Sequence, residues 1–280
     1  MTIFREGLFD GQTAIVTGGG TGIGLAVASE IVTLGGDVAI CGRRPEPLAA
    51  AAERLRAMRS GAQIYQAPCD IRDYDAVAAW VGQAQQALGG IDVLVNNAGG
   101  QFPTTAQHLS ARGFEAVVRN NLQGTWNMTH AVATQALIPR QRGRIVNVIA
   151  QVARGFPGMV HTGAARAGVD NLTKTLAVEW SQHGVRVNAV APGVIKTSGT
   201  RQYPPRLLED AKRANPLKRL GTAPEVAHLI VYLASTFADF VTGQTFTIDG
   251  GASLWGEHWP IPDDVPQYPP YPVDDEPEDG

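Results

Sequence analysis

Short, nearly continuous runs of apolar residues alternate along this chain with longer segments in which apolar residues recur every three or four positions. The short runs are rich in β-branched residues, as expected of strands that are covered on both faces. The longer segments have the period of amphipathic helices. The pattern predicts seven strands, at 13–17, 37–41, 63–67, 93–96, 144–148, 186–191 and 244–248.

Predicted helices fill the intervals between these strands, and three of them are clear, at 45–59, 73–88 and 223–235. The last begins with Thr222, and Glu225 follows three positions later, which is the pattern of a capping box. Strands that alternate with helices imply a parallel sheet with right-handed crossovers. The predicted fold class is therefore α/β, a single doubly wound parallel sheet of about seven strands with helices on both faces.

Composition narrows the class of protein. Apolar residues make up 44% of the 280 residues and charged residues 18%, so the chain can bury a sizeable core. The net charge of −3 argues against a broad nucleic-acid surface. No apolar run of roughly 20 residues predicts a membrane span. The six histidines have no metal-ligand spacing, so no metal is expected.

Two features bear on the compartment. Arg5, Glu6 and Asp10 interrupt the first ten residues, which leaves no apolar segment of a secretory signal. Cys41 and Cys69 end apolar runs and are expected to be buried thiols, which favours a reducing compartment. We therefore expect a cytoplasmic protein.

A glycine-rich segment, Thr17-Gly18-Gly19-Gly20-Thr21-Gly22-Ile23-Gly24, joins the first predicted strand to the helix after it. Strand, glycine turn and helix follow in the order that a dinucleotide pyrophosphate requires. Glycines let the backbone approach the phosphates, and the free N–H groups at the helix start face the negative charge. Without further matching segments, a plain glycine turn would be an equally good interpretation.

Further segments in the same order make the match specific, and with them the chain resembles the short-chain dehydrogenase/reductase superfamily. These segments are Cys69-Asp70-Ile71, Asn96-Asn97-Ala98-Gly99, residues 121–125, residues 144–148, Pro192-Gly193 and residues 242–251. The resemblance implies a Rossmann-type fold and a nicotinamide cofactor. It implies cofactor contacts from Thr17, Gly18, Thr21, Gly22, Ile23, Gly24, Asp70, Ile71, Asn97, Ala98, Gly99, Pro192, Gly193, Ile195 and Thr197.

Two segments, residues 99–102 and 161–169, resemble the peroxisomal trans-2-enoyl-CoA reductases and the related 2,4-dienoyl-CoA reductases. That resemblance implies reduction of a carbon–carbon double bond conjugated to a thioester, with an acyl-CoA as the substrate. Residues 255–263 do not share it, and are more similar to bacterial terpenoid alcohol dehydrogenases of the same superfamily.

The end of the second predicted strand indicates which cofactor is used. Proteins that bind NAD usually place an Asp or Glu here for the ribose 2′-hydroxyl, whereas this chain has Gly42 followed by Arg43 and Arg44. A carboxylate would repel a 2′-phosphate, and a guanidinium binds it bidentately. The residues favour NADP(H), although Arg44 is equally well interpreted as a solvated helix entry.

The expected catalytic residues depart from the superfamily. Most members have a Ser, a Tyr four residues before a Lys, and an Asn. Here Asn121 matches the Asn, but Thr162 stands at the Tyr position and Arg166 at the Lys position. The Ser position falls at Ile149 or Ala150. Arg166 is expected to hold the nicotinamide ribose, because a guanidinium is a poor proton shuttle, and Thr162 is expected to donate a hydrogen bond to a substrate oxygen.

Asp170 and His161 are the candidate proton donors. Asp170 follows Arg166 by four residues, so both project from one face of a helix. In the peroxisomal dienoyl-CoA reductases an Asp that matches Asp170 is implicated in proton transfer. A structural Arg166–Asp170 ion pair is an equally good interpretation. His161 has a titratable imidazole, but a side chain that only shapes the pocket is the simpler interpretation.

The missing Ser and Tyr bear on the reaction. Reduction of a carbonyl leaves an alkoxide that needs a strong local acid. Reduction of an enoyl thioester leaves an enolate, which needs hydrogen-bond donors at its oxygen and accepts a weaker acid at Cα. Two alternatives stay open: an alcohol or aldehyde dehydrogenase with a non-standard acid, and an NADPH-binding protein that has lost catalysis.

Three regions complete the expectations. Residues 195–213 are expected to form a mobile lid in which Lys196, Arg201, Lys212 and Arg213 either meet the phosphates of coenzyme A or are simply solvated. Residues 112–137 and 163–180 resemble the helices that pair subunits in this superfamily, so a homo-oligomer, a tetramer or a dimer, is expected. Residues 1–259 are expected to form the domain and 260–280 a tail.

The tail has seven prolines and seven acidic residues but neither Lys nor Arg, which excludes regular helix. An extended tail, disordered over its last ten residues, is the simplest prediction. Trp255, Trp259, Tyr268 and Tyr271 favour a second hypothesis, in which residues 255–271 pack on this or a neighbouring subunit near the substrate opening.

Overall fold

The computed structural model describes residues 2–255 and 260–267, without the side chains of residues 201 and 202. Seven strands form one sheet in the order β3-β2-β1-β4-β5-β6-β9, and all neighbouring strands are parallel. Each predicted strand is present, with its ends within one residue of the prediction. The strands are β1 (Thr13–Thr17), β2 (Asp37–Gly42), β3 (Ile64–Pro68), β4 (Val93–Asn96), β5 (Gly143–Val148), β6 (Val185–Pro192) and β9 (Thr245–Ile248).

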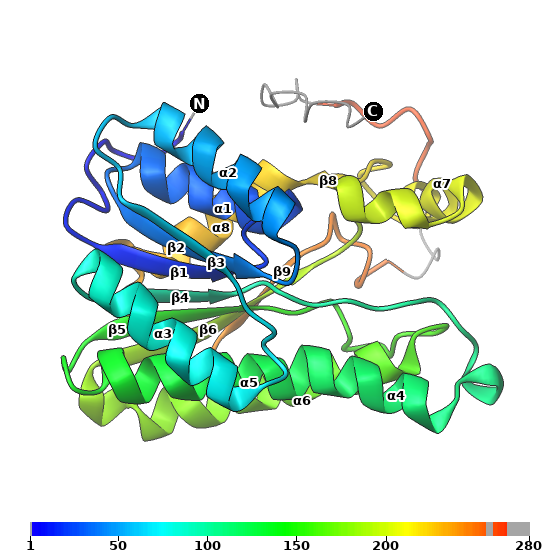
Figure 1. The fold of residues 1–280 in the computed structure, drawn as a ribbon. Helices are drawn as coiled ribbons and strands as arrows, with labels where there is room; N and C mark the ends of the chain where they lie inside the picture. The colour runs from blue at the N-terminus through cyan, green and yellow to red at the C-terminus, as the bar shows by residue number, and fades with distance from the viewer. Residues whose placement is uncertain (1, 256–259, 268–280) are drawn as a thin grey trace.

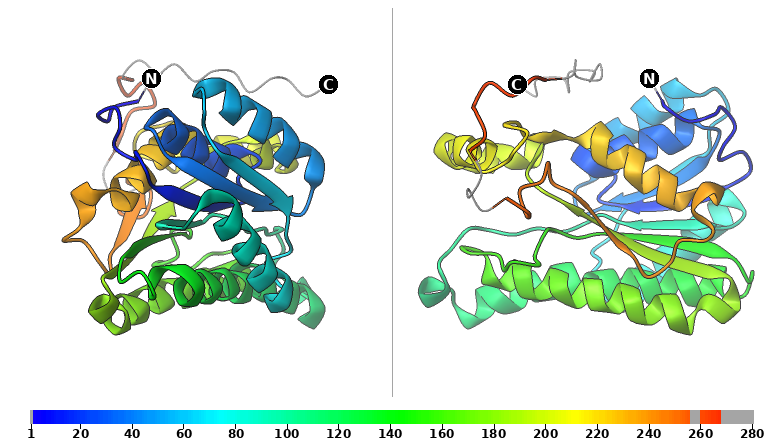
Figure 2. Two further views of the ribbon diagram at one scale, coloured as in Figure 1. Left: turned by 60° about the vertical axis from the view of Figure 1, so that its left-hand side comes forward. Right: turned by 180° about the vertical axis from the view of Figure 1, so that it is seen from behind.

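Helices cover both faces of this sheet, so the predicted doubly wound α/β fold is confirmed (Figure 1). The upper layer in Figure 1 consists of α1 (Gly22–Thr33), α2 (Pro45–Met58) and α8 (Ala223–Ala234). The lower layer consists of α3 (Tyr74–Leu88), α4 (Ala111–Val118), α5 (Gly124–Val132) and α6 (Val160–Glu179). Figure 2 shows the same three layers from two further sides.

Alternate residues of each strand enter two separate cores. In β1, Ala14 and Val16 pack with the upper helices, whereas Ile15 packs with the lower ones. In β4, Leu94 likewise belongs to the lower core. Because successive side chains of a strand point to opposite faces, a strand buried on both faces must be apolar at every position. This is why the strands were visible in the sequence as continuous apolar runs.

The ends of two helices follow from their sequences. Asp73 caps α3 by accepting a hydrogen bond from the backbone N–H of Ala76 at 3.1 Å. The predicted capping box of α8 is present, because the Glu225 carboxylate accepts the backbone N–H of Thr222 at 2.8 Å. Such caps satisfy N–H groups that the helix itself leaves without partners.

The segment predicted as one long helix, 112–137, is more complex. Two π-helical turns, Arg119–Gln123 and Ala133–Leu137, are inserted on either side of α5. A π-helical turn adds a residue to the helical path and changes which side chains face the sheet. The first of them places Asn121 in the candidate site.

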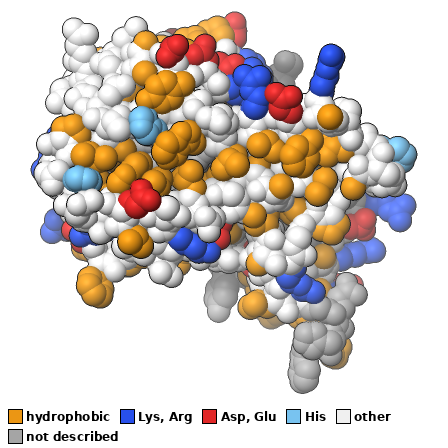
Figure 3. All heavy atoms as spheres, turned by 90° about the horizontal axis from the view of Figure 1, so that it is seen from below, with side chains coloured by type: hydrophobic (Ala, Val, Ile, Leu, Met, Phe, Trp, Pro, Cys, Tyr) orange, Lys and Arg blue, Asp and Glu red, His pale blue; other side chains and the backbone are white. Residues whose placement is uncertain are grey.

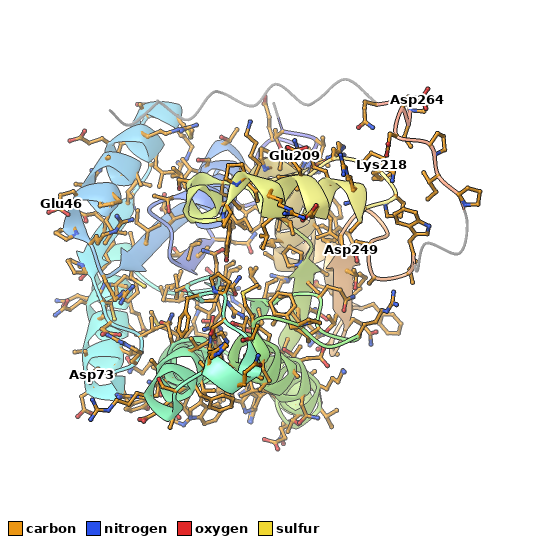
Figure 4. All side chains as sticks on the ribbon, turned by 90° about the vertical axis from the view of Figure 1, so that its right-hand side faces the viewer. Glu46, Asp73, Glu209, Lys218, Asp249 and Asp264 are labelled. Atoms are coloured by element: carbon orange, nitrogen blue, oxygen red, sulfur yellow. The ribbon has the colours of Figure 1, made fainter. Side chains whose placement is uncertain are left out.

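Beyond the carboxyl ends of the strands lie β7 (Ile195–Lys196), the 3-10 turn Ser198–Gln202 and α7 (Pro205–Arg213). β7 pairs with β8 (Gly221–Thr222), which directly precedes α8. This pairing fixes both ends of the segment 195–222 to the main domain. Figure 4 looks onto this edge, where α7, which carries Glu209, crosses above the lower-layer helices. Within the described ranges, no helix combines the length and apolarity needed to cross a membrane.

Candidate active site

A cavity of about 590 Å³ opens where β1 and β4 end. These two strands are neighbours at the point where the strand order reverses, which is where doubly wound sheets bind their ligands. The loops after β1 and β4 form its walls, and the start of the lid region contributes as well. Most of the predicted cofactor residues line this cavity: Gly18, Thr21, Gly22, Ile23, Arg43, Arg44, Asp70, Ile71, Asn97, Ala98, Gly99 and Thr197.

The glycine loop is built for close approach to a ligand. Gly18 and Gly22 have φ angles of +66° and +55°, which other residues rarely adopt. A Cβ atom at Gly24 would collide with the carbonyl oxygen of Gly18, so α1 can begin directly beneath the loop only with glycine there. Thr21, the N-cap of α1, makes no side-chain capping bond, which leaves the first N–H groups of the helix for an anion.

The remaining predicted cofactor residues lie outside the cavity lining. Thr17 supports the wall, since its hydroxyl oxygen accepts the backbone N–H groups of Asn97 and Ala98 at 3.0 and 2.9 Å. Pro192 ends β6. Gly193 and Ile195 line a smaller cavity of about 120 Å³ at the base of the lid region. Sequence reasoning also missed lining residues next to the predicted ones: Gly20, Cys41, Gly42, Pro47, Leu48, Cys69, Asn120, Ser198 and Gly199.

The far end of the cavity, at β2 and β3, carries a local excess of positive charge. Asp70 is held by Arg72, with 2.5 Å between Nη2 and Oδ2 and 2.9 Å between Nε and Oδ1. The hydrogen bonds from Arg72 lower the pKa of Asp70 to about 2. Among the described residues, no carboxylate forms an ion pair with Arg43 or Arg44. Gly42, which ends β2, adds no negative charge.

Cys41 and Cys69 border the same end of the cavity and are free, buried thiols, as predicted. A hydrogen bond to Cys69 and burial together raise the pKa of the Cys41 thiol well above its usual value. Because the thiolate is the reactive form, Cys41 is expected to be inert near neutral pH.

At the other end, Asn121 fixes the turn that follows β4. Its amide nitrogen donates to the carbonyl oxygens of Gly100 and Val117 at 2.7 and 2.8 Å. Its Oδ1 accepts the backbone N–H of Gly100 at 3.3 Å. Both amide hydrogens are therefore already used, and in this conformation Asn121 holds the wall of the site.

Arg166 is a buried cation that forms no ion pair among the described residues. It lies on α6 with 7% of its surface exposed, and its Nη1 has no hydrogen-bond partner. A Cβ atom at Gly99 would collide with its Nη2, so a larger residue there would force the guanidinium to move. Burial lowers the pKa of Arg166 to about 10, which leaves it charged at neutral pH. A buried unpaired charge is costly, and an oxygen-rich ligand would relieve that cost.

These features fit a dinucleotide. The glycine loop and the helix start suit a pyrophosphate, the arginines after β2 suit a further phosphate, and Arg166 suits the sugar hydroxyls or phosphate oxygens at the other end. The described residues contain no group of three or more His, Cys, Asp or Glu side chains placed to hold a metal ion.

His161 and Thr162 lie one turn before Arg166, and both are fully buried. The backbone N–H of Thr162 donates to Nδ1 of His161 at 2.8 Å, so this ring nitrogen is the acceptor and carries no proton. In the neutral ring the hydrogen is then on Nε2, which has no partner. The ring of Phe102 packs edge-on against the imidazole, with 4.7 Å between the ring centroids.

Asp170 faces away from Arg166. Its carboxylate binds Nζ of Lys174 and the hydroxyl of Thr245 on β9, each at 2.5 Å. Burial opposes ionisation, but these hydrogen bonds dominate and lower the pKa of Asp170. The expected alternative of an Arg166–Asp170 ion pair is therefore wrong, since the carboxylate pairs with Lys174 instead.

The lid region contributes Thr197, Ser198 and Gly199 to the cavity. Of the cations considered for coenzyme A, Lys212 is occupied by Glu209 at 2.6 Å and Lys196 is exposed. The side chain of Arg201 lies outside the described residues.

The described part of the tail packs on the segment just after α7. Lys218 lies over the ring of Trp255, 4.5 Å from its centroid, and pairs with Asp263 at 3.6 Å. Gln267 donates to the carbonyl oxygen of Leu217 at 3.0 Å. Figure 4 shows Lys218 between α7 and the tail that carries Asp264. Trp259, Tyr268 and Tyr271 lie outside the described residues.

Residues 18–253 match the family described as Enoyl-(Acyl carrier protein) reductase. With this fold and site, the chain belongs to the short-chain dehydrogenase/reductase family. It is 37% identical over 251 residues to a probable 2,4-dienoyl-CoA reductase of Bacillus subtilis, covering 87% of this chain and 97% of the relative. It is 37% identical to the peroxisomal 2,4-dienoyl-CoA reductase of Danio rerio, covering 90% and 85%.

Solved structures extend the likeness. A citronellol catabolism dehydrogenase, AtuB, of Pseudomonas aeruginosa is 45% identical with a TM-score of 0.81, over 90% of this chain and 99% of that one. A levodione reductase is 28% identical with a TM-score of 0.84, over 88% and 100%. The resemblance stated from the sequence motifs is therefore confirmed.

Proposed function

We propose that this protein uses NADPH to reduce the carbon–carbon double bond of a trans-2-enoyl-CoA or 2,4-dienoyl-CoA thioester. The observation that carries the proposal is the donor set on α6, where Arg166 and His161 are buried with unpaired N–H groups and no phenol stands at position 162. Such a set stabilises an oxyanion but supplies no strong acid. The 2,4-dienoyl-CoA reductases among the relatives support the same class of substrate.

The choice of NADPH rests on charge. Arg43 and Arg44 border the cavity beyond β2 without a carboxylate at Gly42, and a guanidinium recognises a phosphate bidentately. When bound, the reduced nicotinamide supplies a hydride. Arg166 holds the sugar next to it, because its Nη2 lies against Gly99 on the cavity wall.

His161 stabilises the charge that develops on the thioester oxygen. Its Nδ1 is occupied by the backbone N–H of Thr162, so Nε2 presents a hydrogen in the neutral ring. A preorganised donor in a buried site is worth roughly 3–4 kcal/mol of transition-state stabilisation. The Thr162 hydroxyl lies 3.3 Å from the same Nδ1 and is a second candidate donor.

Asp170 is the less favoured proton donor. Its two carboxylate oxygens are committed to Lys174 and Thr245. If Asp170→Asn and His161→Gln both keep full activity, the proton at Cα comes from another group or from water.

A second function has a specific observation in its favour, the 45% identity to the citronellol catabolism dehydrogenase. It is oxidation of a terpenoid alcohol or reduction of its aldehyde. That reaction needs an acid–base group at the substrate oxygen, and Thr162 stands where most members of the family have a phenol.

Subunit association is part of the proposal. The lower-layer face shows many apolar side chains between scattered charges (Figure 3). Its helices carry the exposed residues Phe114, Val160 and Val178. We expect this face to pair subunits in a dimer or tetramer.

The test is oxidation of NADPH, followed by absorbance, with trans-2-enoyl-CoAs of three chain lengths, a 2,4-dienoyl-CoA, and matched aldehydes and ketones. Turnover of a thioester but not of a carbonyl supports the proposal. Turnover of carbonyls alone selects the dehydrogenase. Tight NADPH binding without any turnover selects a cofactor-binding protein that has lost catalysis.

A further inference from the structure

A hydrogen bond joins the segment after β4 to the lid region. The side-chain nitrogen of Gln101 donates to the hydroxyl oxygen of Tyr203 at 3.1 Å, and both residues are partly buried. Gln101 belongs to the wall after β4, whereas Tyr203 lies in the lid region between the turn Ser198–Gln202 and α7. This bond therefore links residues that are 102 positions apart in the sequence.

The wall segment that binds this phenol runs from the cavity to the buried donor set. Gln101 lies two residues after Gly99, which lines the cavity and approaches Arg166. It directly precedes Phe102, which packs on His161. The hydrogen bond from Gln101 therefore holds Tyr203 against the segment that contacts the donor set.

The other tyrosines of the described ranges are placed elsewhere. Tyr65 on β3 donates to Gln83, and Tyr74 at the start of α3 is bound to His130. Tyr232 packs with α8 against the upper core. Tyr203 is thus the one phenol in the described part of the chain that stands beside the candidate active site.

The direction of the hydrogen bond leaves the phenol ready to act as an acid. Gln101 is the donor, so the oxygen of Tyr203 is the acceptor and its own hydrogen has no acceptor among the described residues. The lid region therefore carries an O–H group that is bound to the wall segment beside a donor set on α6 that lacks a strong acid.

We infer that Tyr203 is the proton donor of the reaction and that Gln101 is its positioning residue. The inference rests on the proposed function, which it deepens. Negative charge on the thioester oxygen of the reduced substrate is held by His161. The O–H bond of Tyr203 breaks, a C–H bond forms at Cα, and the enolate electrons restore the thioester carbonyl. The phenolate then regains a proton from water, so each turnover consumes one solvent proton.

Three variants test this role: Tyr203→Phe, Gln101→Leu and the pair together, with Tyr232→Phe as a matched loss of a phenol hydroxyl away from the site. We expect Tyr203→Phe to lower kcat roughly 100-fold or more, as loss of a general acid does, with the Kd for NADPH unchanged. Gln101→Leu is expected to cost less than Tyr203→Phe, and to cost nothing further in the double variant. Tyr232→Phe should behave as the wild type.

A second measurement distinguishes a proton donor from a residue that only holds the lid region in place. In D₂O the wild-type protein should place deuterium on one face of Cα, seen by NMR of the product. Residual turnover by Tyr203→Phe should place it on both faces. The inference would be overturned if Tyr203→Phe and Gln101→Leu raised KM equally, left kcat unchanged and still placed deuterium on one face. A full kcat in Tyr203→Phe would also overturn it.

Failure of the proposed function would look different, because the wild-type protein would then reduce no enoyl or dienoyl thioester. If it reduces a carbonyl instead, the same variants assayed on that carbonyl still decide whether Tyr203 supplies the proton. The Kd for NADPH, measured by fluorescence, reports cofactor binding independently of either outcome.

Discussion

Cofactor choice depends on single residues around the end of β2. A Cβ atom at Gly42 would make an ordinary contact of 3.7 Å with Leu48, so a larger side chain fits there. We predict that Gly42→Asp shifts the ratio of kcat/KM for NADPH over NADH toward NADH by about tenfold or more, because its carboxylate repels a 2′-phosphate and accepts a ribose hydroxyl. Gly42→Ala is the control, and an equal shift in that variant would contradict the explanation.

A second prediction at this scale concerns Arg166, whose buried charge has no partner in the protein alone. Replacing an unpaired buried charge by an apolar residue removes a desolvation cost. Arg166→Met should therefore raise the Tm of the cofactor-free protein by roughly 2–4 °C, while the Kd for NADPH rises about 10–100-fold through loss of a charged hydrogen bond. Arg166→Lys should keep most of the affinity. A lower Tm in Arg166→Met would contradict this account.

Individual residues also mark the limit of sequence reasoning. The glycine loop, Arg43, Asn97 and Thr197 could be placed because local order along the chain fixes them beside one edge of the sheet. The partners of Asp170 could not, since Thr245 lies 75 residues away on β9. The bond between Gln101 and Tyr203 depends in the same way on where the lid folds.

At the scale of the element, the start of α8 is the clearest case for a stability measurement. Glu225 accepts the backbone N–H of Thr222 and pairs with Arg219 at 2.6 Å. Glu225→Ala should lower the free energy of unfolding by about 1–2 kcal/mol, as loss of a cap does. Glu225→Gln keeps a backbone acceptor and loses only a half-exposed ion pair, so its cost should be under about 1 kcal/mol.

The same cap has a defined pH dependence. Hydrogen bonds from Arg219 and Thr222 lower the pKa of Glu225 below its usual value, against the opposing effect of burial. A carboxylate with a lowered pKa stabilises the folded state above its unfolded pKa, about 4.3, and that contribution is lost as the pH falls. The stability difference between the wild type and Glu225→Ala should therefore shrink below about pH 4 in chemical denaturation.

The tail is the second element with a prediction of its own. Its described residues contact Leu217 and Lys218, which immediately follow the lid region. Ending the chain after Trp255 should raise the KM for the acyl-CoA several-fold by loosening this support, and should leave the Kd for NADPH unchanged. Ending it after Gln267 keeps the described contacts and is the control. Unchanged kinetics in the shorter chain would mean that the tail has no part in the site.

Among the elements, the seven strands of the sheet and the three clear helices were predicted to within one residue, because their periodicity is a local property of burial. The segment 163–180 begins three residues inside α6. The π-helical turns at Arg119–Gln123 and Ala133–Leu137 were not, because the residues around them have the same helical period. The short pairing of β7 with β8 was also missed, since two-residue strands leave no pattern.

For the whole molecule, we expect the lower-layer face in Figure 3 to pair the subunits. Val178 on α6 is 76% exposed, and covering its apolar surface with a second subunit would be favourable. We predict that the wild type is a dimer or tetramer by light scattering and that Val178→Glu dissociates it at least in part. Met58→Glu on α2, which starts 38% exposed in the upper layer, should leave the assembly intact. A monomeric wild type would contradict the prediction.

Because the strands are parallel, the edge of the sheet at their carboxyl ends differs from the edge at their amino ends. The cavity, the lid region and the tail contacts all gather where the strands end. The opposite edge carries turns that return the chain from a helix to the next strand, and Gly61 and Gly89 there have open space around them. Foreign peptides, affinity tags or new chain termini placed at those turns would leave the chemistry untouched, so this edge is where the protein can be re-engineered or can diverge freely.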